Sequence, residues 1–577
     1  MSTTSSKPAR PTELSTELHD AIWSQKPVFK RVLGYTLLTA FLSLAPTGYM
    51  MEVYDRVVNS RNGDTLLMLT VLVLFAYLVL EFFELVRVRF LKVAGDGIER
   101  TLRLRLFDLG LDAQLKYQPV LSQGLFDHLR RLREFMSSPA MLAVFDAPMS
   151  LIFLVLVFLI HPYLGFFSLL SAVVQFVLSY LAERRTQVPY EAALKASNQS
   201  QVFAGSVFRS AHIVRALGME RAIHRKWLGK QNEFLELQAT ASDHAGFNSA
   251  VSKFIQVFQG SMILGLSCWL TLKGSFSGNS SLMIVASILG GRILQPLVVL
   301  TGQWRSVAGA IESYRRLEEA LARIPAPKTS MSLPAPKGVL TVEQVSAGFP
   351  GNPALVLRGI QFAVAPGEIL LVAGPSASGK STLCKLLVGV LPPLAGKVRL
   401  DGSDVHAWNK EELGPHVGYL PQEVELLEGT VSDNVARFGV PDAPVLDAAL
   451  QQAGASDLVS QLPEGVRFGL DENGSTLSGG ERQKIGLARA FYGQPSLMVL
   501  DEPNASLDEA SEARLLQSLM EAKKAGAAIV VVSHQTKLLQ VADKLLVLRD
   551  GQQLAFGPRD EVLAKLSPKP VTQQSGS

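Results

Sequence analysis

One stretch decides the fold of the C-terminal part of this sequence: Gly374-Pro375-Ser376-Ala377-Ser378-Gly379-Lys380-Ser381. It matches the pattern G-x-x-x-x-G-K-[ST] without a mismatch, and it lies between the apolar run 368–373 and a helical run that starts at Thr382. In this setting the glycines turn backbone N–H groups towards phosphates, Lys380 reaches the β and γ oxygens, and the hydroxyl of Ser381 binds Mg²⁺. We therefore predict that this stretch and Thr382 bind a nucleotide. The alternative is a glycine-rich turn before an ordinary helix.

The composition separates two regions of the chain. At 577 residues the sequence is too long for one core. Its N-terminal half carries apolar runs long enough to cross a bilayer, whereas its C-terminal part mixes charge with short apolar segments, as soluble α/β domains do. The net charge of +4 comes without a basic stripe, which argues against a nucleic-acid partner. The two cysteines, Cys268 and Cys384, indicate neither a disulfide framework nor a metal site.

Segment by segment, the sequence predicts an α-helical polytopic membrane domain fused to an α/β domain. The N-terminal tail lacks the apolar core of a secretory signal, and its portion Glu17–Trp23 fits either an amphipathic surface helix or a loop. The predicted segments are a cytoplasmic tail 1–27, a membrane domain 28–323, a Pro-rich linker 324–338, a soluble domain 339–566 and a flexible tail 567–577.

Six apolar runs of about 20 residues predict six membrane spans. They are 31–52, 64–89, 140–160, 163–182, 248–272 and 281–303. The connections 90–139 and 183–247 are long, charged and helical in pattern, so we expect the spanning helices to continue past the bilayer into the cytoplasm. The hairpin tips are then predicted near Tyr117–Ser122 and Ser206–Leu217. Two independent helical insertions are the alternative.

Basic residues gather on the side of the long connections. They are Lys26, Lys30, Arg31, Arg87, Arg89, Lys92, Arg184, Arg185, Arg305, Arg315 and Arg316. Because positive charge stays on the cytoplasmic side, both termini are predicted to be cytoplasmic.

Four ionisable residues fall inside the apolar runs: Glu81, Glu84, Asp146 and Arg292. A charge is costly in lipid, so each is expected to face protein or water. They are candidates for a polar path for cargo. Mutual pairing or an extended position near the cytoplasmic end is the alternative, especially for Glu84. Arg292 is predicted to line such a path or to form a charge pair across the bundle.

A second chemical motif follows the phosphate loop along the chain. The apolar strand 497–500 ends in Asp501 and Glu502. An aspartate in this place holds Mg²⁺, and the adjacent glutamate can polarise the attacking water. The alternative is an ordinary buried strand followed by a turn.

A third motif lies between the phosphate loop and the strand 497–500. It is Leu477-Ser478-Gly479-Gly480-Glu481, directly before a helical run. Serine and glycine at a helix start form another anion site, although the first loop already serves one nucleotide. The motif therefore suggests a dimer. It resembles the signature of ATP-binding-cassette (ABC) proteins, which implies a head-to-tail pair with each nucleotide between one phosphate loop and the other subunit's signature.

The resemblance assigns roles to further residues. It implies that Phe349 stacks on the adenine, although this residue could also be plain core. Gln422 matches the residue that touches Mg²⁺ and the attacking water, Asp508 the loop that crosses to the other subunit, and His534 the γ-phosphate sensor. In Asp471-Glu472-Asn473-Gly474, Glu472 occupies the acidic position of a loop that senses the opposite hairpin.

Together these assignments imply an ATPase that uses ATP and Mg²⁺. The catalytic residues are Glu502, His534, Gln422 and Lys380. The ligands of the metal ion are Ser381, Gln422 and Asp501. Since all are present, a homodimer is expected to have two hydrolytic sites.

Six spans ahead of one cassette resemble an ABC exporter half-transporter. Four stretches resemble type I secretion ATPases of the branch that exports RTX proteins, metalloproteases and lipases: 53–66, 145–153, 161–165 and 433–439. This implies a bacterial inner-membrane homodimer in the lipid bilayer, with a membrane-fusion protein, an outer-membrane channel and a secreted protein cargo as partners. Residues 1–27 leave no room for a peptidase-like domain, so cargo with an uncleaved C-terminal signal is expected. A lipid or small-molecule exporter, an ATP-gated channel and a non-transporting scaffold remain alternatives.

Overall fold

The computed structural model describes residues 16–115, 124–274, 280–325, 332–348, 354–471, 474 and 476–566. The chain divides into two compact units, the first made of residues 1–113 and 119–326 and the second of residues 114–118 and 327–577. The boundary between 326 and 327 falls inside the segment predicted as the linker. Phe349, Glu472 and the predicted hairpin tip Tyr117–Ser122 lie outside the described residues.

The first unit contains six helical segments long and apolar enough to span a membrane, as predicted. They are Lys26–Ser60, Gly63–Leu115, Pro139–Ile160, Pro162–Arg209, Glu220–Leu272 and Ser281–Gly302. The first segment is interrupted and consists of α2 (Lys26–Leu42), α3 (Ala45–Glu52), the π-helical turn η1 (Val53–Val57) and α4 (Val58–Ser60). A proline lies in the first turn of α3, directly after the break, a position where proline is favoured.

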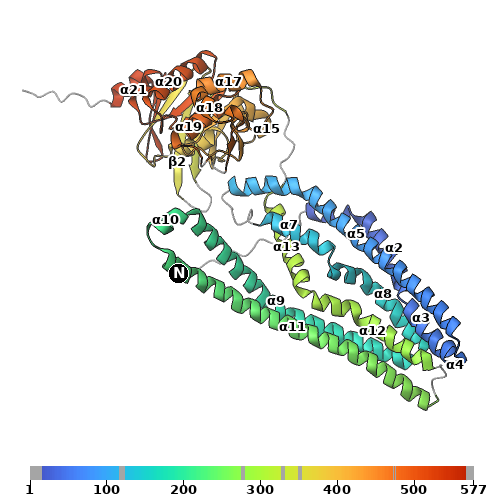
Figure 1. The fold of residues 1–577 in the computed structure, drawn as a ribbon. Coiled ribbons are helices and arrows are strands. Elements are labelled where there is room, and N and C mark those ends of the chain that lie inside the picture. Colours follow the sequence, from blue (N-terminus) through green and yellow to red (C-terminus); the bar gives the residue numbers. More distant parts are fainter. Residues whose placement is uncertain are drawn as a thin grey trace, which may run out of the picture. The chain divides into compact units, whose positions relative to one another are not determined.

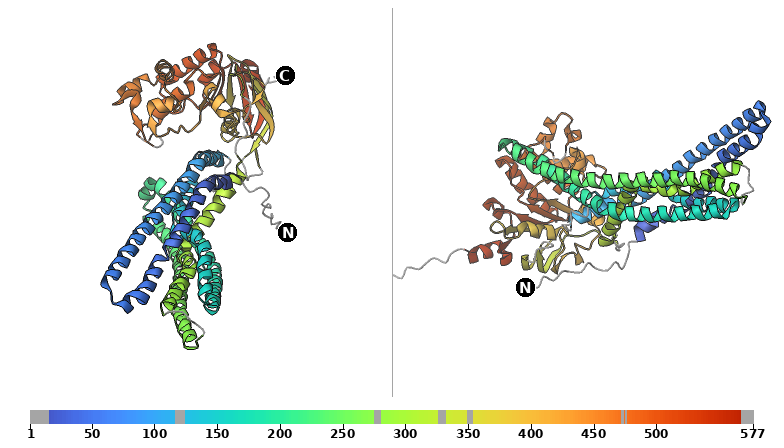
Figure 2. Two further views of the ribbon diagram at one scale, coloured as in Figure 1. Left: turned by 90° about the vertical axis from the view of Figure 1, so that its right-hand side faces the viewer. Right: turned by 90° about the horizontal axis from the view of Figure 1, so that it is seen from below.

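Three helices of this unit are far longer than the roughly 20 residues that a bilayer requires. They are α5 (Gly63–Leu115), α9 (Pro162–Arg209) and α11 (Glu220–Leu272), with 53, 48 and 53 residues. Helices α9 and α11 run side by side, and the short α10 (Ala211–Ala216) joins them (Figure 1 and Figure 2). Spanning helices therefore continue without interruption into the long connections. The predicted tip near Ser206–Leu217 is confirmed, and the alternative of independent insertions is wrong.

Shorter helices complete this unit. They are α7 (Leu125–Met136), α8 (Pro139–Ile160), α12 (Ser280–Gly302) and α13 (Trp304–Arg323). The N-terminal segment forms a helix, α1 (Thr16–Trp23), rather than a loop. Its Leu18 is fully buried in a cluster with Leu102 of α5 and Leu317 of α13, and Glu17 Oε2 accepts a hydrogen bond from Arg105 Nε at 2.9 Å. The tail predicted for 1–27 is thus a packed helix in its second half.

The second unit is an α/β domain with two main sheets. The antiparallel sheet has the order β2-β1-β4-β5, with β1 (Leu340–Gly348), β2 (Leu355–Val364), β4 (Ala395–Leu400) and β5 (Ser403–Asp404). The six-stranded sheet has the order β12-β11-β3-β10-β9-β6, with β3 (Ile369–Ala373), β6 (Val417–Leu420), β9 (Leu497–Asp501), β10 (Ala528–Val532), β11 (Lys544–Arg549) and β12 (Gln552–Pro558). A small ribbon pairs β7 (Gly429–Thr430) with β8 (Gly469–Leu470).

The helices of this unit are interspersed with the strands. They are α14 (Lys380–Leu387), α15 (Lys410–Leu413), α16 (Val431–Val435), α17 (Ala443–Gln452), α18 (Ser456–Gln461), α19 (Gly479–Phe491), α20 (Glu509–Lys524) and α21 (Arg559–Leu566), with the 3₁₀ turns η2 (Gly414–His416), η3 (Gly465–Arg467) and η5 (Thr536–Gln540).

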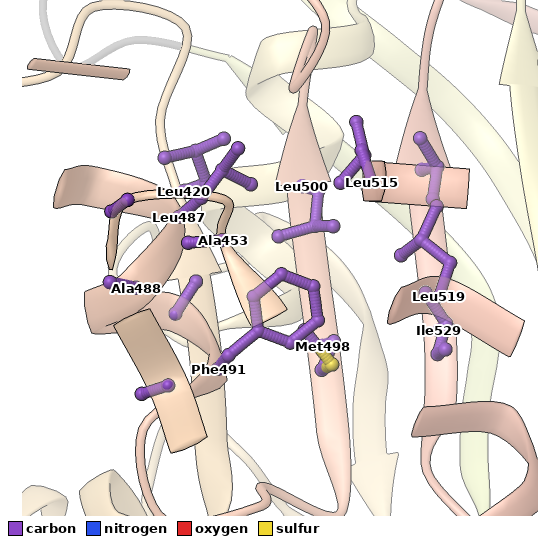
Figure 3. Close-up of a cluster of buried hydrophobic side chains, with 14 of the residues drawn as sticks. Leu420, Ala453, Leu487, Ala488, Phe491, Met498, Leu500, Leu515, Leu519 and Ile529 are labelled. Carbon is purple, nitrogen blue, oxygen red and sulfur yellow. The ribbon is translucent and has the colours of Figure 1, made fainter. Parts of the chain in front are cut away.

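Both faces of the six-stranded sheet are buried. Successive side chains of a strand point to opposite faces, so Met498 and Leu500 of β9 join one core while Leu497 and Val499 join the other. The first core packs α19 and α20 against β9 and β10 (Figure 3). The second lies between this sheet, α14 and the antiparallel sheet. Continuous apolar strands such as 497–500 are typical of parallel sheets covered on both sides.

Candidate active site

Four loops that carry predicted site residues leave neighbouring strands at the same edge of the sheet. Strands β3, β10, β9 and β6 are parallel and adjacent in that order. Their carboxyl ends are followed by Gly374, His534, Glu502 and Gln422. Because the carboxyl ends of parallel strands meet at one edge, the topology brings together residues that are up to 160 positions apart in the chain.

The phosphate loop needs glycine at its two ends. Gly374 and Gly379 adopt φ angles of +155° and +96°. A Cβ on Gly374 would lie 2.3 Å from the carbonyl oxygen of Leu548, and one on Gly379 would lie 2.5 Å from Cδ2 of Leu357. Helix α14 begins directly after Gly379, so its free N–H groups and positive end face the loop.

Two side chains of the phosphate loop have environments that suit an anionic ligand. The Lys380 ammonium donates hydrogen bonds to the carbonyl oxygens of Gly374 and Pro375, both at 2.9 Å. Burial lowers the pKa of Lys380, and the nearby carboxylates of Glu502 and Asp501 counter this effect. The Ser378 hydroxyl is buried and has no hydrogen-bond partner within the described part of the chain. A buried unpaired hydroxyl in a glycine-lined loop fits a phosphate ligand.

The residues predicted to bind the metal ion and the water form one continuous series of contacts. Ser381 Oγ lies 3.4 Å from Gln422 Oε1, and Gln422 Nε2 lies 3.4 Å from Glu502 Oε2. On the other side, His534 Nε2 lies 3.5 Å from Glu502 Oε1. The structure thus places the predicted catalytic base between the predicted metal ligand and the predicted sensor.

Asp501 lies under this series at the end of β9. Its carboxyl is almost fully buried, which raises its pKa, while a hydrogen bond from Ser381 acts in the opposite direction. Asp501, Ser381 and Gln422 offer hard oxygen atoms, the ligands that Mg²⁺ prefers. The described residues contain no group of three or more His, Cys, Asp or Glu that could hold a metal alone. Mg²⁺ commonly binds through one or two carboxylates and the phosphates of its substrate, and Asp501 offers one such carboxylate.

The backbone of Glu502 is held in an unusual conformation. Its φ angle is +52°, in the left-handed region that non-glycine residues rarely adopt. Its N–H donates to Val532 O at 2.9 Å. The buried amide of Gln483 on α19 donates to the carbonyl oxygens of Glu502 at 3.3 Å and Pro503 at 3.1 Å. Strain of this kind persists only where the surroundings fix it, so Gln483 is a positioning residue for the base.

Sequence reasoning missed this role of Gln483, because nothing in the spacing shows that its amide reaches a strand end 19 residues away. It also missed a second tie between two site loops. Ser533, the neighbour of His534, donates its hydroxyl proton to Asn504 Oδ1 at 3.1 Å, and both residues are buried. The local indication was that Ser533 directly follows the buried strand β10 and that Asn504 lies three residues after the end of β9.

The signature residues form the capped start of α19. Ser478 is the N-cap: its Oγ accepts from Glu481 N at 3.4 Å, and Glu481 Oε2 accepts from Ser478 N at 2.7 Å. These bonds lower the pKa of Glu481. A Cβ on Gly480 would lie 2.7 Å from Ser506 O, so glycine is required there by close packing. The motif thus presents a rigid helix N-terminus suited to an anion.

Asp508 has a structural role within its own subunit. It caps α20, and its carboxylate accepts a hydrogen bond from Ser511 N at 2.9 Å. This contact lowers the pKa of Asp508. Its predicted place in a loop that crosses to a partner remains a prediction.

Replacing Gln483 with alanine is expected to lower kcat for ATP hydrolysis about tenfold and to leave the Kd for ATP within about twofold. The substitution leaves two buried carbonyls unpaired, at a cost of about 1–3 kcal/mol, and lets the Glu502 peptide relax, whereas Gln483 does not touch the phosphate loop. Steady-state ATPase kinetics and binding of a fluorescent ATP analogue measure the two constants. Gln451→Ala, on the exposed face of α17, is the matched control. An unchanged kcat in Gln483→Ala would contradict the positioning role.

The fold and this site define an ATP-hydrolysing cassette joined to a six-span membrane unit, which is the architecture of an ATP-driven transporter. Family models agree: the one described as ABC transporter matches residues 357–505, and the one described as ABC transporter transmembrane region matches residues 33–292.

Individual proteins are similar over most of the chain. The type I secretion system ATP-binding protein PrsD of Rhizobium meliloti (strain 1021) is 35% identical over 545 residues, which cover 93% of each chain. The ATP-dependent lipid A-core flippase of Xanthomonas campestris pv. campestris (strain 8004) is 28% identical over 398 residues, covering 68% of this chain and 67% of the flippase. The structure of a bacterial Atm1-family ABC exporter with ATP bound has a TM-score of 0.80 at 19% identity and covers 94% of this chain and 96% of its own.

The chain therefore belongs to the ABC transporters, in the group of type I secretion ATP-binding proteins. It is a multi-pass membrane protein with an exporter fold, and its cassette binds and hydrolyses ATP to drive transport.

Proposed function

We propose that this chain exports an unfolded protein as the homodimeric ATPase and permease of a type I secretion system in a bacterial inner membrane. The observation that carries the proposal is the similarity to PrsD, which extends over 93% of both chains, whereas the similarity to the lipid A-core flippase extends over 68% of this chain. It is important that the similarity to PrsD extends over both units. All ABC ATPases share the cassette, whereas the membrane unit is the part that contacts the cargo.

In the proposed mechanism, each site residue has a separate role in ATP hydrolysis. Glu502 accepts a proton from the attacking water, Gln422 orients that water, and His534 keeps the Glu502 carboxylate in place. Lys380 and the N-terminus of α14 neutralise charge on the phosphates. Mg²⁺, held by Ser381, Gln422 and Asp501, would supply further electrostatic stabilisation of the phosphates.

Two copies of the chain are proposed to share each nucleotide. The phosphate loop binds one side of ATP, and the helix start at Ser478 provides a second anion site. Within the described residues, the N–H and hydroxyl of Ser478 bond Glu481, and its carbonyl oxygen accepts from Arg482 N at 3.0 Å. The N–H groups of the first helical residues, Gly479 and Gly480, are the ones suited to a ligand. ATP then favours the closed pair, and hydrolysis reopens it.

The long helices suit the transmission of this motion. We propose that α9, α10 and α11 carry cassette movement into the bilayer, with both termini and the cassette in the cytoplasm. A membrane-fusion protein and an outer-membrane channel would extend the path across the cell envelope. The complete set of hydrolytic residues favours a transporter over an ATP-gated channel.

The export of protein is tested by reconstituting the full chain in liposomes and measuring ATPase activity with added cargo. An unfolded polypeptide is expected to stimulate hydrolysis several-fold, while lipid A leaves it unchanged. Lys380→Ala serves as the inactive control. Stimulation by lipid A and none by polypeptide would overturn the proposal in favour of a lipid exporter.

A further inference from the structure

One cavity in the membrane unit collects all four ionisable residues that the sequence places inside apolar runs. Its volume is about 410 Å³, and it lies between α2, α5, α8 and α12. Glu81, Glu84, Asp146 and Arg292 line it, together with Arg87. We call this cavity the carboxylate pocket. Since charges inside a membrane are costly, such a concentration of them indicates a site.

Arg87 pairs with two of the three carboxylates that line the carboxylate pocket. Its side chain is 1% exposed and donates hydrogen bonds to Glu84 Oε1 at 2.8 Å, to Asp146 and to Thr39 Oγ1 at 3.2 Å. These partners lie on α5, α8 and α2. Glu84 is thus paired, although with Arg87 and not with another of the four ionisable residues inside the apolar runs. The sequence predicts Arg87 at the end of the run 64–89, on the side of the long connections, and the structure adds that its guanidinium turns into the bundle to meet the carboxylates. The Nε of Arg87 has no hydrogen-bond partner in the described part of the chain, so one hydrogen-bond donor in the lining of the pocket is unpaired.

Two charges at the pocket remain without an opposite partner. Glu81 is exposed, and the described residues give it neither an ion pair nor a hydrogen bond. Among the same residues, the Arg292 guanidinium donates to one group, the amide oxygen of Gln295 at 3.3 Å, and the charge pair predicted for it is not formed. With three carboxylates against two guanidinium groups, the lining carries one net negative charge.

This chemistry selects among possible occupants. An extended polypeptide inside a membrane needs partners for its N–H and C=O groups, and the pocket offers acceptors such as Glu81 and donors such as Arg292 and Tyr77. A lipid with phosphate groups would instead meet a lining of three carboxylates and two guanidinium groups, whose net charge is negative. Basic side chains of a polypeptide match the net charge and find Glu81 available.

We propose that the carboxylate pocket binds the exported polypeptide within the membrane unit and that Glu81 receives its basic side chains. The inference rests on the proposed function and deepens it, because it names the part of the cargo that the pocket recognises. Arg87 acts as a positioning residue: it holds Glu84 and Asp146 by hydrogen bonds, so that among the described residues Glu81 is the carboxylate of the pocket without a partner.

The test compares two unstructured Gly/Ser-rich peptides, one carrying lysines and one carrying glutamines at the same positions, on the full chain in liposomes. In the Glu81→Gln variant, the lysine peptide is expected to need about fivefold higher concentration for half-maximal ATPase stimulation, the effect of losing one partly exposed charge-assisted contact. The glutamine peptide is expected to act on Glu81→Gln as it acts on the unmodified chain. Asp64→Asn, on the same helix outside the pocket, is the matched control.

Direct coupling gives a second measurement. A carbodiimide joins a lysine amine to a carboxylate in contact with it, and peptide mapping by mass spectrometry is expected to find the lysine peptide on Glu81. Glu81→Asp, which keeps the carboxylate, is expected to retain the preference for lysine and shows that loss in Glu81→Gln is not misfolding. Equal responses of Glu81→Gln and the unmodified chain to both peptides would overturn the inference. A chain stimulated by lipid A and by neither peptide would instead overturn the proposed function.

Discussion

Replacement of Glu502 by glutamine is expected to lower kcat for ATP hydrolysis by about 10²–10⁴-fold while ATP binding is retained, because the amide cannot accept the proton of the attacking water. The substitution keeps the size of the side chain and its contacts with Gln422 and His534, so the site keeps its shape. Steady-state ATPase kinetics and binding of a fluorescent ATP analogue measure the two effects. Because ATP persists, the variant is also expected to remain dimeric in ATP, which size-exclusion chromatography in detergent detects.

Glu464→Gln is the control for this prediction, since Glu464 is an exposed carboxylate in the same unit and outside the site. It is expected to hydrolyse ATP as the unmodified chain does. Substantial turnover by Glu502→Gln would show that another group takes the proton. His534 would then be the next candidate, since its Nε2 lies 3.5 Å from the same carboxylate.

Replacement of Arg87 by methionine is expected to destabilise the membrane unit by about 3 kcal/mol. Removing one partner of a buried ionic group costs about 3–5 kcal/mol, because the charges left behind are uncompensated. The lower end applies here, since the side chains of Glu84 and Asp146 are 36% and 40% exposed and keep part of their hydration. Equilibrium unfolding of the full chain in mixed micelles, by titration with dodecyl sulfate, measures the change.

Two further variants make this prediction specific. Arg89→Met removes an exposed arginine from the same helix and is expected to change stability by less than about 0.5 kcal/mol. The triple variant Arg87→Met, Glu84→Gln, Asp146→Asn removes the whole ionic group and is expected to recover most of the loss, because replacing a complete buried ion cluster is often close to neutral. If Arg87→Met unfolds at the same detergent fraction as the unmodified chain, Arg87 does not hold α2, α5 and α8 together.

Local patterns in the sequence determined the elements of this protein. A backbone that must turn N–H groups towards phosphates requires glycines at fixed spacing, and 374–381 therefore identified the phosphate loop before any fold was known. The bilayer requires about 20 apolar residues for each span, so run lengths alone located all six spanning segments. The helical charge pattern of 183–247 likewise predicted the long α9 and α11 with a tip between them.

Contacts between distant segments were decided by the tertiary structure. Arg87 lies 59 residues from Asp146. The sequence placed Arg87 on the side of the long connections but did not indicate this partner, because hydropathy depends on the charge of a residue and not on what the residue pairs with. Gln483 donates a hydrogen bond to the backbone of Glu502, the predicted base, although nothing in its local pattern distinguishes it from any glutamine on a helix. Periodicity and motif spacing reveal interactions that are repeated along the chain. A single hydrogen bond or ion pair between helices depends instead on where the fold brings two side chains, and their positions are fixed only when the helices pack.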